Sequence, residues 1–401
     1  MKNIIVGQSG GPTAVINSSL CGVYSMAKQL GAGKVYGMVN GIEGLIAQKT
    51  IDLDTYLKTD LDLEILKRTP SSFLGSCRYK LPKIEEAQVY ENIFTILQSM
   101  EIDCFFYIGG NDSMDTIMKL SVYGESIKSP IRFIGVPKTV DNDLAVTDHS
   151  PGFGSAAKFI ATTMKEIILD AHVYANNSIT LVEVMGRNAG WLTAAAALCK
   201  SDDSIGPDAL FLPESVFDLD CFMDKADKLA QNGCAVIVIS EGIKTADGKY
   251  VQELGKENAA VDSFGHRQLS GTAHYLSGLI SSKLGRKTRA IEFATLQRAA
   301  AHIASATDVN EAFNLGKEAV KTAADNKTNK VVIITRLSSE PYIYKIDAID
   351  IKKIANIEKK IPLEWIKNDY ITNDFIEYAF PLIQGEYTPY YVNGIPRHIK
   401  L

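Results

Sequence analysis

Apolar residues fall into two patterns along the chain: short continuous runs, and longer segments in which they recur with helical spacing. The short runs predict buried strands over 3–6, 34–39, 104–108, 131–136, 178–184, 209–212, 234–240 and 330–335. The periodic segments predict helices over 14–30, 85–98, 114–123, 155–174, 191–200, 221–231, 269–283, 312–324 and 351–360. Strands and helices alternate regularly, which predicts an α/β fold with two Rossmann-like, doubly wound lobes and mostly parallel sheets.

The length of 401 residues exceeds what one hydrophobic core usually supports. We therefore expect an N-terminal lobe over 1–150, completed by roughly 297–340, and a second lobe over 151–296. From 341 to 401 the composition shifts toward Tyr, Ile, Lys and Pro, which predicts a C-terminal extension that packs on the lobes.

Composition and charge exclude several classes of partner. The net charge of −5 predicts no basic surface for nucleic acid or anionic membranes, and no apolar stretch approaches the roughly 18 residues of a membrane span. The first apolar run is too short for a signal peptide. The six cysteines lack C-x-x-C spacing, so we expect reduced thiols in a cytoplasmic protein. Packing or hydrogen-bonding roles, rather than metal ligation, are expected for His149, His172, His274 and His302.

The first candidate site is the glycine loop over 7–13, which lies between a predicted strand and a predicted helix. It lacks the lysine of a P-loop and does not fit G-x-G-x-x-G. Gly10 and Gly11 would still let backbone N–H groups approach an anion at the positive end of a helix. Taken alone, the loop is equally consistent with a tight turn.

Two further polar segments follow buried strands, which is where open α/β sheets place their ligands. Gly-Gly-Asn-Asp-Ser occupies 109–113, and Pro-Lys-Thr-Val-Asp-Asn-Asp occupies 137–143. Helix capping explains one polar residue of the first segment, but not three. The second segment combines Lys138 with carboxylates. Phosphoryl transfer to an alcohol needs a carboxylate to accept the hydroxyl proton and cations to spread the charge of the moving group. Together the segments predict a phosphoryl-transfer site.

Other motifs along the chain follow the order seen in one enzyme family. They are Met-Gly-Arg-Asn-Ala-Gly-Trp over 185–191, Ser-Glu-Gly-Ile over 240–243, Gly-His at 265–266 and Leu-Gln-Arg over 296–298. With these motifs, from Gly10 through Arg298, the chain resembles the phosphofructokinase family. The resemblance implies two α/β lobes, Mg²⁺ as cofactor, and fructose 6-phosphate as phosphoryl acceptor in glycolysis or gluconeogenesis. It also implies a homodimer or homotetramer.

The resemblance extends to the choice of phosphoryl donor. ATP-dependent members generally carry Gly-Gly-Asp-Gly-Ser, in which the glycine after the aspartate leaves room for the α-phosphate of the nucleotide. Here that position is Asp112, whose carboxylate would repel a nucleotide phosphate. Lys138 occupies the place typical of pyrophosphate-dependent members, where it can hold the departing phosphate. The resemblance therefore implies pyrophosphate as donor, with fructose 1,6-bisphosphate and phosphate as products of a reversible reaction.

The same resemblance implies a role for each matched residue. Asp141 would take the proton from the 1-hydroxyl of the sugar, and Asp143 would support Asp141 or the metal. The sugar would contact Thr139, Met185, Gly186, Arg187 and Glu241, with its 6-phosphate near Arg289 and Arg298. Pyrophosphate would contact Gly10, Gly11, Arg78, Gly110 and Ser113, beside Lys138 and Asp112.

Three positions depart from the family pattern. Asn111 replaces the usual metal-binding aspartate and can offer a carbonyl oxygen but no charge. Mg²⁺ would then rest mainly on the substrate phosphates and on Asp112, Asp141 or Asp143. Thr295 replaces a His or Tyr that commonly contacts the sugar. Ser178 replaces an arginine that many ATP-dependent members donate to a neighbouring subunit.

Two alternatives stay open within the same fold. An ATP-dependent 6-phosphofructokinase is disfavoured by Asp112 and Lys138. A noncatalytic regulatory subunit gains slight support from Asn111 and Thr295, but the retained Asp141 speaks against it. NAD kinases share a Gly-Gly-Asp-Gly loop, but their pattern does not account for the 139–143 segment. A dinucleotide-binding oxidoreductase is weaker still, because no G-x-G-x-x-G opens the chain.

Overall fold

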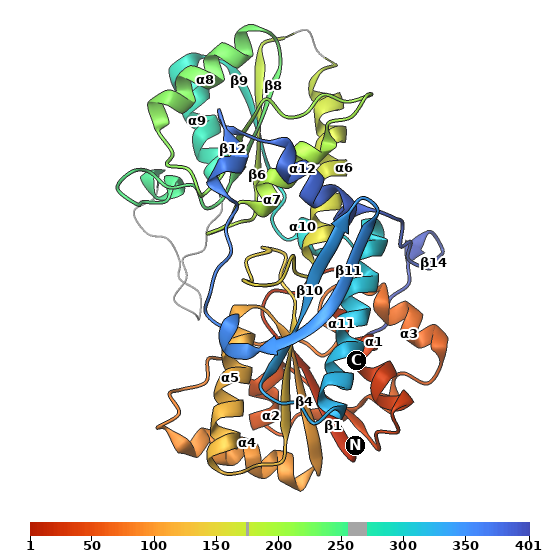
Figure 1. Cartoon of the computed structure of the whole chain (residues 1–401). Helices are drawn as coiled ribbons and strands as arrows, with labels where there is room; N and C mark the ends of the chain where they lie inside the picture. The colour runs from red at the N-terminus through yellow and green to blue at the C-terminus, as the bar shows by residue number, and fades with distance from the viewer. Residues whose placement is uncertain (174–175, 256–270) are drawn as a thin grey trace. The chain divides into compact units, whose positions relative to one another are not determined.

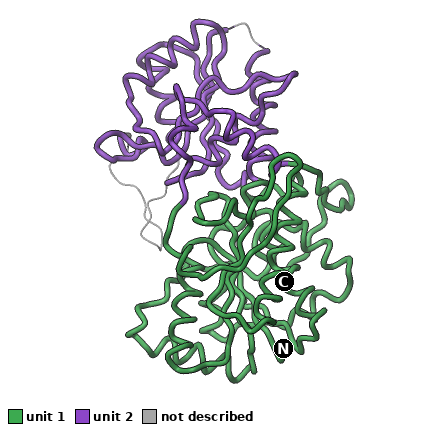
Figure 2. The backbone as a smooth tube through the Cα atoms, in the orientation of Figure 1, with its two compact units in different colours: residues 1–155, 298–358, 384–401 green, residues 156–297, 359–383 purple. Residues whose placement is uncertain are grey.

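The computed structural model describes residues 1–173, 176–255 and 271–401. Backbone contacts divide these residues into two units, drawn in different colours in Figure 2. Unit 1 comprises 1–155, 298–358 and 384–401, and unit 2 comprises 156–297 and 359–383. Residues 341–401, expected to form an extension, therefore contribute to both units. The Gly-His motif at 265–266 lies outside the described residues, as do the first residues of the predicted helix 269–283 and the last of 155–174.

Unit 1 is built on a seven-stranded sheet with the order β11-β10-β5-β4-β1-β2-β3. Its strands are β1 (Asn3–Gln8), β2 (Val35–Met38), β3 (Thr50–Asp52), β4 (Ile102–Gly109), β5 (Arg132–Pro137), β10 (Lys330–Ser339) and β11 (Tyr342–Asp350). The inner strands pair in parallel, whereas β3 and β11 are antiparallel edges. Continuous apolar runs suit the inner strands because both of their faces are covered by helices.

Alternate residues of these strands pack into two separate apolar clusters, one on each face of the sheet. Ile4 and Phe106 join the cluster that contains α1 (Ile16–Gln29) and α11 (Ala306–Ala324). Neighbouring residues Ile5 and Phe105 join the opposite cluster. That cluster includes residues of α2 (Gly41–Ile46), α4 (Ala87–Ser99) and α5 (Asn111–Ser126), and α3 (Asp60–Lys67) packs with α1. Helices on both faces define a doubly wound unit.

Unit 2 contains a smaller, wholly parallel sheet with the order β7-β8-β6-β9. Its strands are β6 (Ser178–Val184), β7 (Ala209–Phe211), β8 (Ala235–Ser240) and β9 (Lys287–Glu292). The main helices are α6 (Phe153–Ala171), which begins in unit 1, α7 (Trp191–Ala195), α8 (Leu219–Gln231), α9 (Thr272–Leu284), α10 (Leu296–Ala299), which spans the unit boundary, and α12 (Asn373–Ala379). Figure 1 labels these helices and the strands β6, β8 and β9. The two sheets confirm the predicted α/β class.

The predicted helix over 351–360 is wrong. Only a 3-10 turn, Ile351–Lys353, forms there, and Asn356 adopts a left-handed backbone with φ 62°. A right-handed helix does not continue through that conformation. Ile351 and Ile354 are fully buried. The apolar periodicity thus reflects anchoring of an irregular segment rather than a helix.

Other departures concern edge strands and a shorter helix. The sequence does not predict the strands β9 and β11, because charged residues interrupt their apolar positions. The predicted helix over 191–200 is α7 followed by the 3-10 helix Ala196–Cys199. In the described part of the chain, none of the helices is both long and apolar enough to cross a bilayer.

Candidate active site

Three loops of unit 1 leave the sheet at neighbouring strand ends. The parallel register aligns Gln8 with Ile108, and Gly109 with Pro137. Backbone hydrogen bonds join the loops beyond the strands: Ser9 N–H donates to the Ile108 carbonyl at 3.0 Å, and Lys138 N–H donates to the Gly109 carbonyl at 2.9 Å. The glycine loop, the 109–113 segment and the 137–143 segment therefore meet at the carboxyl edge of β1, β4 and β5.

Lys138 lies buried among these loops, with a residue exposure of 2%. Its Nζ donates to the carbonyl oxygens of Ser9 at 2.9 Å and Gly11 at 2.6 Å. Burial lowers the pKa of Lys138 to about 8, opposed by the Asp141 charge and reinforced by the positive charge of Arg298. An ammonium has three N–H donors. After two bonds to the glycine loop, one donor is left to bind an anion.

The carboxylates of Asp141 and Asp143 form the acidic part of the site. Burial, followed by the nearby Asp141 charge, raises the pKa of Asp143 to about 7. The Asp141 backbone N–H donates to Thr139 Oγ1 at 3.2 Å. The negative charge of Asp141 thus disfavours ionisation of Asp143, as is expected when two carboxyl groups lie near each other.

Asn142 holds the backbone between these two carboxylates. It is fully buried with φ 53°, and its Oδ1 accepts a hydrogen bond from the Ser150 N–H at 3.0 Å. The loop closes further on, where Thr139 N–H donates to the Pro151 carbonyl at 3.1 Å. The directions of the neighbouring aspartates are therefore set by internal bonds of the loop.

The 109–113 segment forms the start of α5. Ser113 packs so closely on Gly109 that a Cβ atom added to Gly109 would collide with Ser113 Oγ. Asn111 Oδ1 is buried and has no hydrogen-bond partner. Asp112 is about half exposed and its Oδ1 lies 3.4 Å from the Nζ of Lys80. The amide oxygen of Asn111 is thus available to a ligand, and the Asp112 carboxylate lies toward solvent.

Other predicted donor residues lie beside the glycine loop. Ser76 Oγ donates to the Gly10 carbonyl at 2.6 Å, which brings the segment containing Arg78 to the loop. A Cβ atom at Gly11 would lie 3.1 Å from a terminal nitrogen of Arg298. Arg298, predicted to bind the sugar 6-phosphate, is therefore placed next to the predicted donor loop in unit 1.

The predicted sugar residues of unit 2 follow β6 and β8. Gly186 N–H donates to Glu241 Oε1 at 3.3 Å, and Ser240 Oγ donates to the Gly186 carbonyl. Gly186 has φ 143°, and a side chain on Gly242 would collide with the Arg187 carbonyl. These glycines let the 185–187 and 240–242 segments pack together at the carboxyl edge of the smaller sheet.

Arg289 is not brought to that edge. It lies within β9, in register with Thr180, and its side chain pairs with Asp170 at 2.8 Å on the surface. Five residues of extended strand separate the level of Thr180 from that of Met185, which is roughly 16 Å at the usual rise. Arg289 is therefore remote from the other predicted sugar residues of its own unit.

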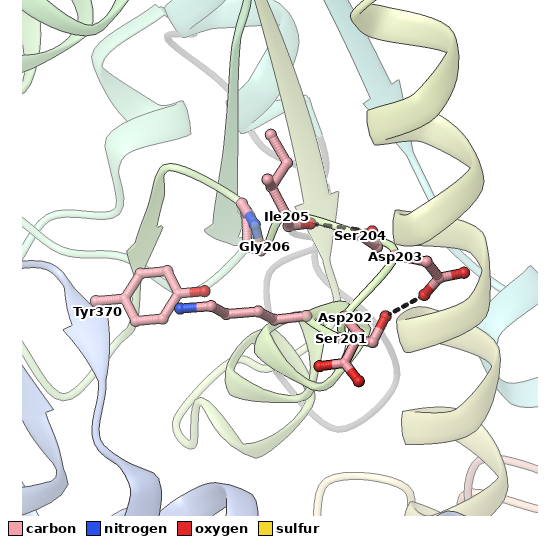
Figure 3. Close-up of a pocket in the computed structure, with 9 residues that line it drawn as sticks. Ser201, Asp202, Asp203, Ser204, Ile205, Gly206 and Tyr370 are labelled. Carbon is pink, nitrogen blue, oxygen red and sulfur yellow. Dashed lines mark hydrogen bonds between the residues drawn. The ribbon is translucent and has the colours of Figure 1, made fainter.

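A surface cavity of about 600 Å³ in unit 2 contains none of the predicted site residues (Figure 3). It is lined by 200–207 and Tyr370, and Lys165 pairs with Asp203 at 2.7 Å beside it. Within residues 1–173, 176–255 and 271–401, no three His, Cys, Asp or Glu side chains gather closely enough to hold a metal ion. The predicted site is consequently defined by loop contacts, and not by this cavity.

Comparison with known proteins adds to this geometry. Residues 3–323 match the family described as Phosphofructokinase. Pyrophosphate–fructose 6-phosphate 1-phosphotransferases of Halomonas elongata and Methylococcus capsulatus are 42% and 41% identical, and each alignment covers 100% of this chain and 96% of the relative. The crystal structure of a pyrophosphate-dependent phosphofructokinase from Marinobacter aquaeolei matches with a TM-score of 0.88 and 38% identity, covering 99% of this chain and 95% of that chain.

Proposed function

The chain belongs to the phosphofructokinase family, and we propose that it transfers a phosphoryl group from pyrophosphate to the 1-hydroxyl of fructose 6-phosphate. The products are fructose 1,6-bisphosphate and phosphate, and the reaction is reversible. The observation that carries the donor assignment is Lys138, a buried ammonium held by two backbone carbonyls beside the Asp141–Asp143 pair. Full-length relatives with the same activity in their names support it.

Donor choice follows from Lys138 and Asp112. The remaining N–H of Lys138 binds an oxygen of the departing phosphate and neutralises its growing charge. A nucleotide would have to extend its α-phosphate past the start of α5, where Asp112 adds a negative charge. Like-charge repulsion there selects against the longer donor.

Asp141 accepts the proton of the sugar hydroxyl in this proposal. Asp143, with its pKa raised to about 7, lies close enough to affect the charge of Asp141. The Asn142 anchor limits movement of both side chains. Orientation of this kind accounts for much of the acceleration in reactions whose chemistry needs little covalent help from the protein. Thr139 and the unit 2 residues Met185, Gly186, Arg187 and Glu241 bind the sugar.

The start of α5 offers one unpartnered oxygen toward a divalent cation. The buried, unpartnered Oδ1 of Asn111 is an oxygen ligand of the kind that Mg²⁺ prefers, and Asp112 lies one residue further. We propose that these two residues hold Mg²⁺ together with the substrate phosphates. When bound, the ion supplies positive charge that offsets the negative charge of the phosphates.

We also propose that the enzyme is a cytoplasmic homodimer or homotetramer. The position of Arg289 supports an assembly of two or more copies. Its predicted ligand is the sugar phosphate, but it lies remote from the Met185 segment of its own unit, so we propose that it serves the sugar site of another copy. Light scattering on the purified chain measures the mass directly. A monomer at assay concentration would contradict the assembly.

The reaction is tested by ³¹P NMR on the purified chain with fructose 6-phosphate, pyrophosphate and Mg²⁺. We expect the pyrophosphate signal to be replaced by those of phosphate and a second sugar phosphate. Fructose 1,6-bisphosphate with phosphate should regenerate pyrophosphate. The Asp141→Asn variant is the control for contaminating activity, and a chain with neither direction of turnover would rule out the proposed function and support a noncatalytic role.

A further inference from the structure

A buried charged cluster lies behind the loop that carries the two aspartates. His149, in the segment between β5 and α6, is 1% exposed. Its Nδ1 lies 2.8 Å from Asp148 Oδ2, and its Nε2 lies 2.6 Å from Glu311 Oε2 in α11. A neutral imidazole donates from one nitrogen only, whereas the protonated ring donates from both. Two carboxylates facing both nitrogens therefore favour the charged ring.

The groups around this ring come from every element packed against it. Arg336 of β10 pairs with Asp148 at 2.9 Å, and Tyr342 of β11 donates its hydroxyl to Glu311 Oε1 at 2.5 Å. From α11, the buried Asp308 accepts hydrogen bonds from the Gly152 and Ser155 N–H groups. Another β11 residue, Tyr344, has a raised pKa, chiefly through burial, with a smaller contribution from the Glu311 charge. Negative charge therefore predominates around the ring.

The balance of these effects keeps the ring charged. Burial by itself would lower the pKa of His149, but the Glu311 charge and the hydrogen bonds to both carboxylates raise it to about 9. The same contacts leave the pKa of Asp148 below its usual range, although burial opposes this. The cluster therefore holds the ring between two side-chain oxygens that favour its charged form. Removing one carboxylate leaves a buried charge without full compensation.

Short covalent and hydrogen-bond links connect His149 to the aspartate segment. The next residue, Ser150, donates its N–H to Asn142 Oδ1, and Asn142 lies between Asp141 and Asp143. On the other side, Thr147 Oγ1 accepts from the Ile334 N–H at 3.1 Å. The ring thus fastens the returning half of the loop to α11, one residue from the bond that shapes the aspartate pair.

We propose that His149 is a positioning residue for phosphoryl transfer, whose charged ring, held between Asp148 and Glu311, fixes the loop that carries Asp141 and Asp143. The inference rests on the proposed function for the role of Asp141. It assigns no direct contact between His149 and a substrate. Its consequence is that loss of charge on the ring affects turnover more than substrate binding.

The test is Glu311→Gln, which keeps the size of the side chain and removes the charge that retains the proton. We expect the pKa of His149, measured by NMR of histidine-labelled protein, to fall from about 9 by roughly two units or more, so that the ring loses its charge near neutral pH. The His149→Gln variant identifies the signal among the six histidines. We expect kcat to fall about 10- to 100-fold, with the greater loss at higher pH, and both KM values to change less than about threefold.

Tyr342→Phe is the matched control, because it removes another hydrogen bond to Glu311 but leaves the ring and both carboxylates. In the Tyr342→Phe variant the pKa of His149 should not fall, and kcat should stay within about twofold of wild type.

If Glu311→Gln does not fold, Asp148→Asn removes the partially exposed partner of His149 and should lower both the pKa of His149 and kcat. A neutral ring at pH 7 in wild type, or an unchanged kcat in a variant with a lowered pKa, would overturn the positioning role. Absence of wild-type turnover would overturn both this role and the proposed function, whereas the NMR titration still reports the charge of the ring.

Discussion

The carboxyl edge of the large sheet in unit 1 holds its charges differently from the small sheet in unit 2. In unit 1, Lys138 is almost fully buried and bonded to backbone carbonyls, and Asp143 has a pKa raised to about 7 by burial and by Asp141. In unit 2, Arg289 lies on the surface and pairs with one exposed carboxylate. Charges of the first kind are part of the fold and cannot rearrange easily. Those of the second kind can exchange a side-chain partner for a ligand at little cost.

This difference predicts that substitutions in unit 1 mainly affect turnover and that substitutions of the surface arginine affect binding. A preorganised, buried charge acts on the transition state without reorganisation. A surface arginine adds binding energy to the ground state and the transition state alike. Kinetic separation of kcat from KM is therefore the appropriate readout.

The largest effect is expected for Asp141→Asn. Loss of the proton acceptor should lower kcat by about 10²- to 10⁴-fold, with little change in KM for fructose 6-phosphate. Discontinuous assays of phosphate release measure both kcat and KM. Circular dichroism provides the control for folding, and a folded variant with near wild-type kcat would exclude Asp141 as the base.

Lys138→Met comes next. Removing the buried ammonium should lower kcat with pyrophosphate by about 10²- to 10³-fold, with a smaller change in KM for pyrophosphate. The matched control is Lys119→Met, which removes a partly buried lysine that also bonds a backbone carbonyl, Leu81 O at 3.0 Å. A similar loss in both variants would show that the effect is structural.

The wild-type pH profile tests the same group without substitution. The lowered pKa of Lys138 means that its charged form predominates below about pH 8 and is lost above it. Because pyrophosphate binds to the charged form, kcat/KM for pyrophosphate should fall as pH rises through about 8, approaching tenfold per pH unit. A profile that stays flat to pH 10 would contradict this assignment of the buried ammonium.

A smaller effect is expected for Arg289→Ala. If Arg289 binds the sugar 6-phosphate, KM for fructose 6-phosphate should rise about tenfold with kcat nearly unchanged. Arg286→Ala is the control, since Arg286 also pairs with an aspartate, Asp227 at 2.8 Å, although this pair is more buried than that of Arg289. Equal KM values for the two variants would remove Arg289 from the sugar site.

The smallest effect concerns donor range. The double variant with Asp112→Gly and Lys138→Gly should show detectable turnover with ATP. The repulsive carboxylate is removed, and the smaller residue at 138 leaves room for the nucleotide. Each single variant serves as the comparison. An undiminished preference for pyrophosphate in the double variant would invalidate the steric and electrostatic argument.

Sequence patterns reveal the fold wherever burial is continuous, and miss it where burial is partial. The strands that carry the site are apolar on both faces, so β1, β4 and β5 and their polar ends are evident from the sequence. The edge strand β9 alternates charged and half-buried residues, and its pattern resembles a loop. The predicted helix over 351–360 fails for the opposite reason, because buried isoleucines anchor an irregular segment.

The candidate site shows the same limit at the level of single residues. Local motifs identify Lys138 and Asp141, since their chemistry follows from neighbours in the chain. The Glu311 partner of His149 lies 162 residues away, in a helix whose polar positions resemble a solvent-facing surface. His149 was accordingly expected to have only a packing or hydrogen-bonding role. Pairings of this kind depend on the tertiary fold, and no local pattern signals them.

The most direct test of the account is a donor-specificity assay on the purified wild-type chain, with fructose 6-phosphate, Mg²⁺, and pyrophosphate or ATP offered separately. Turnover is followed through aldolase-coupled detection of fructose 1,6-bisphosphate. The buried Lys138 and the Asp112 carboxylate predict kcat/KM at least about 10²-fold higher with pyrophosphate than with ATP. A preference for ATP would contradict the donor assignment, and turnover with neither donor would contradict the proposed reaction itself.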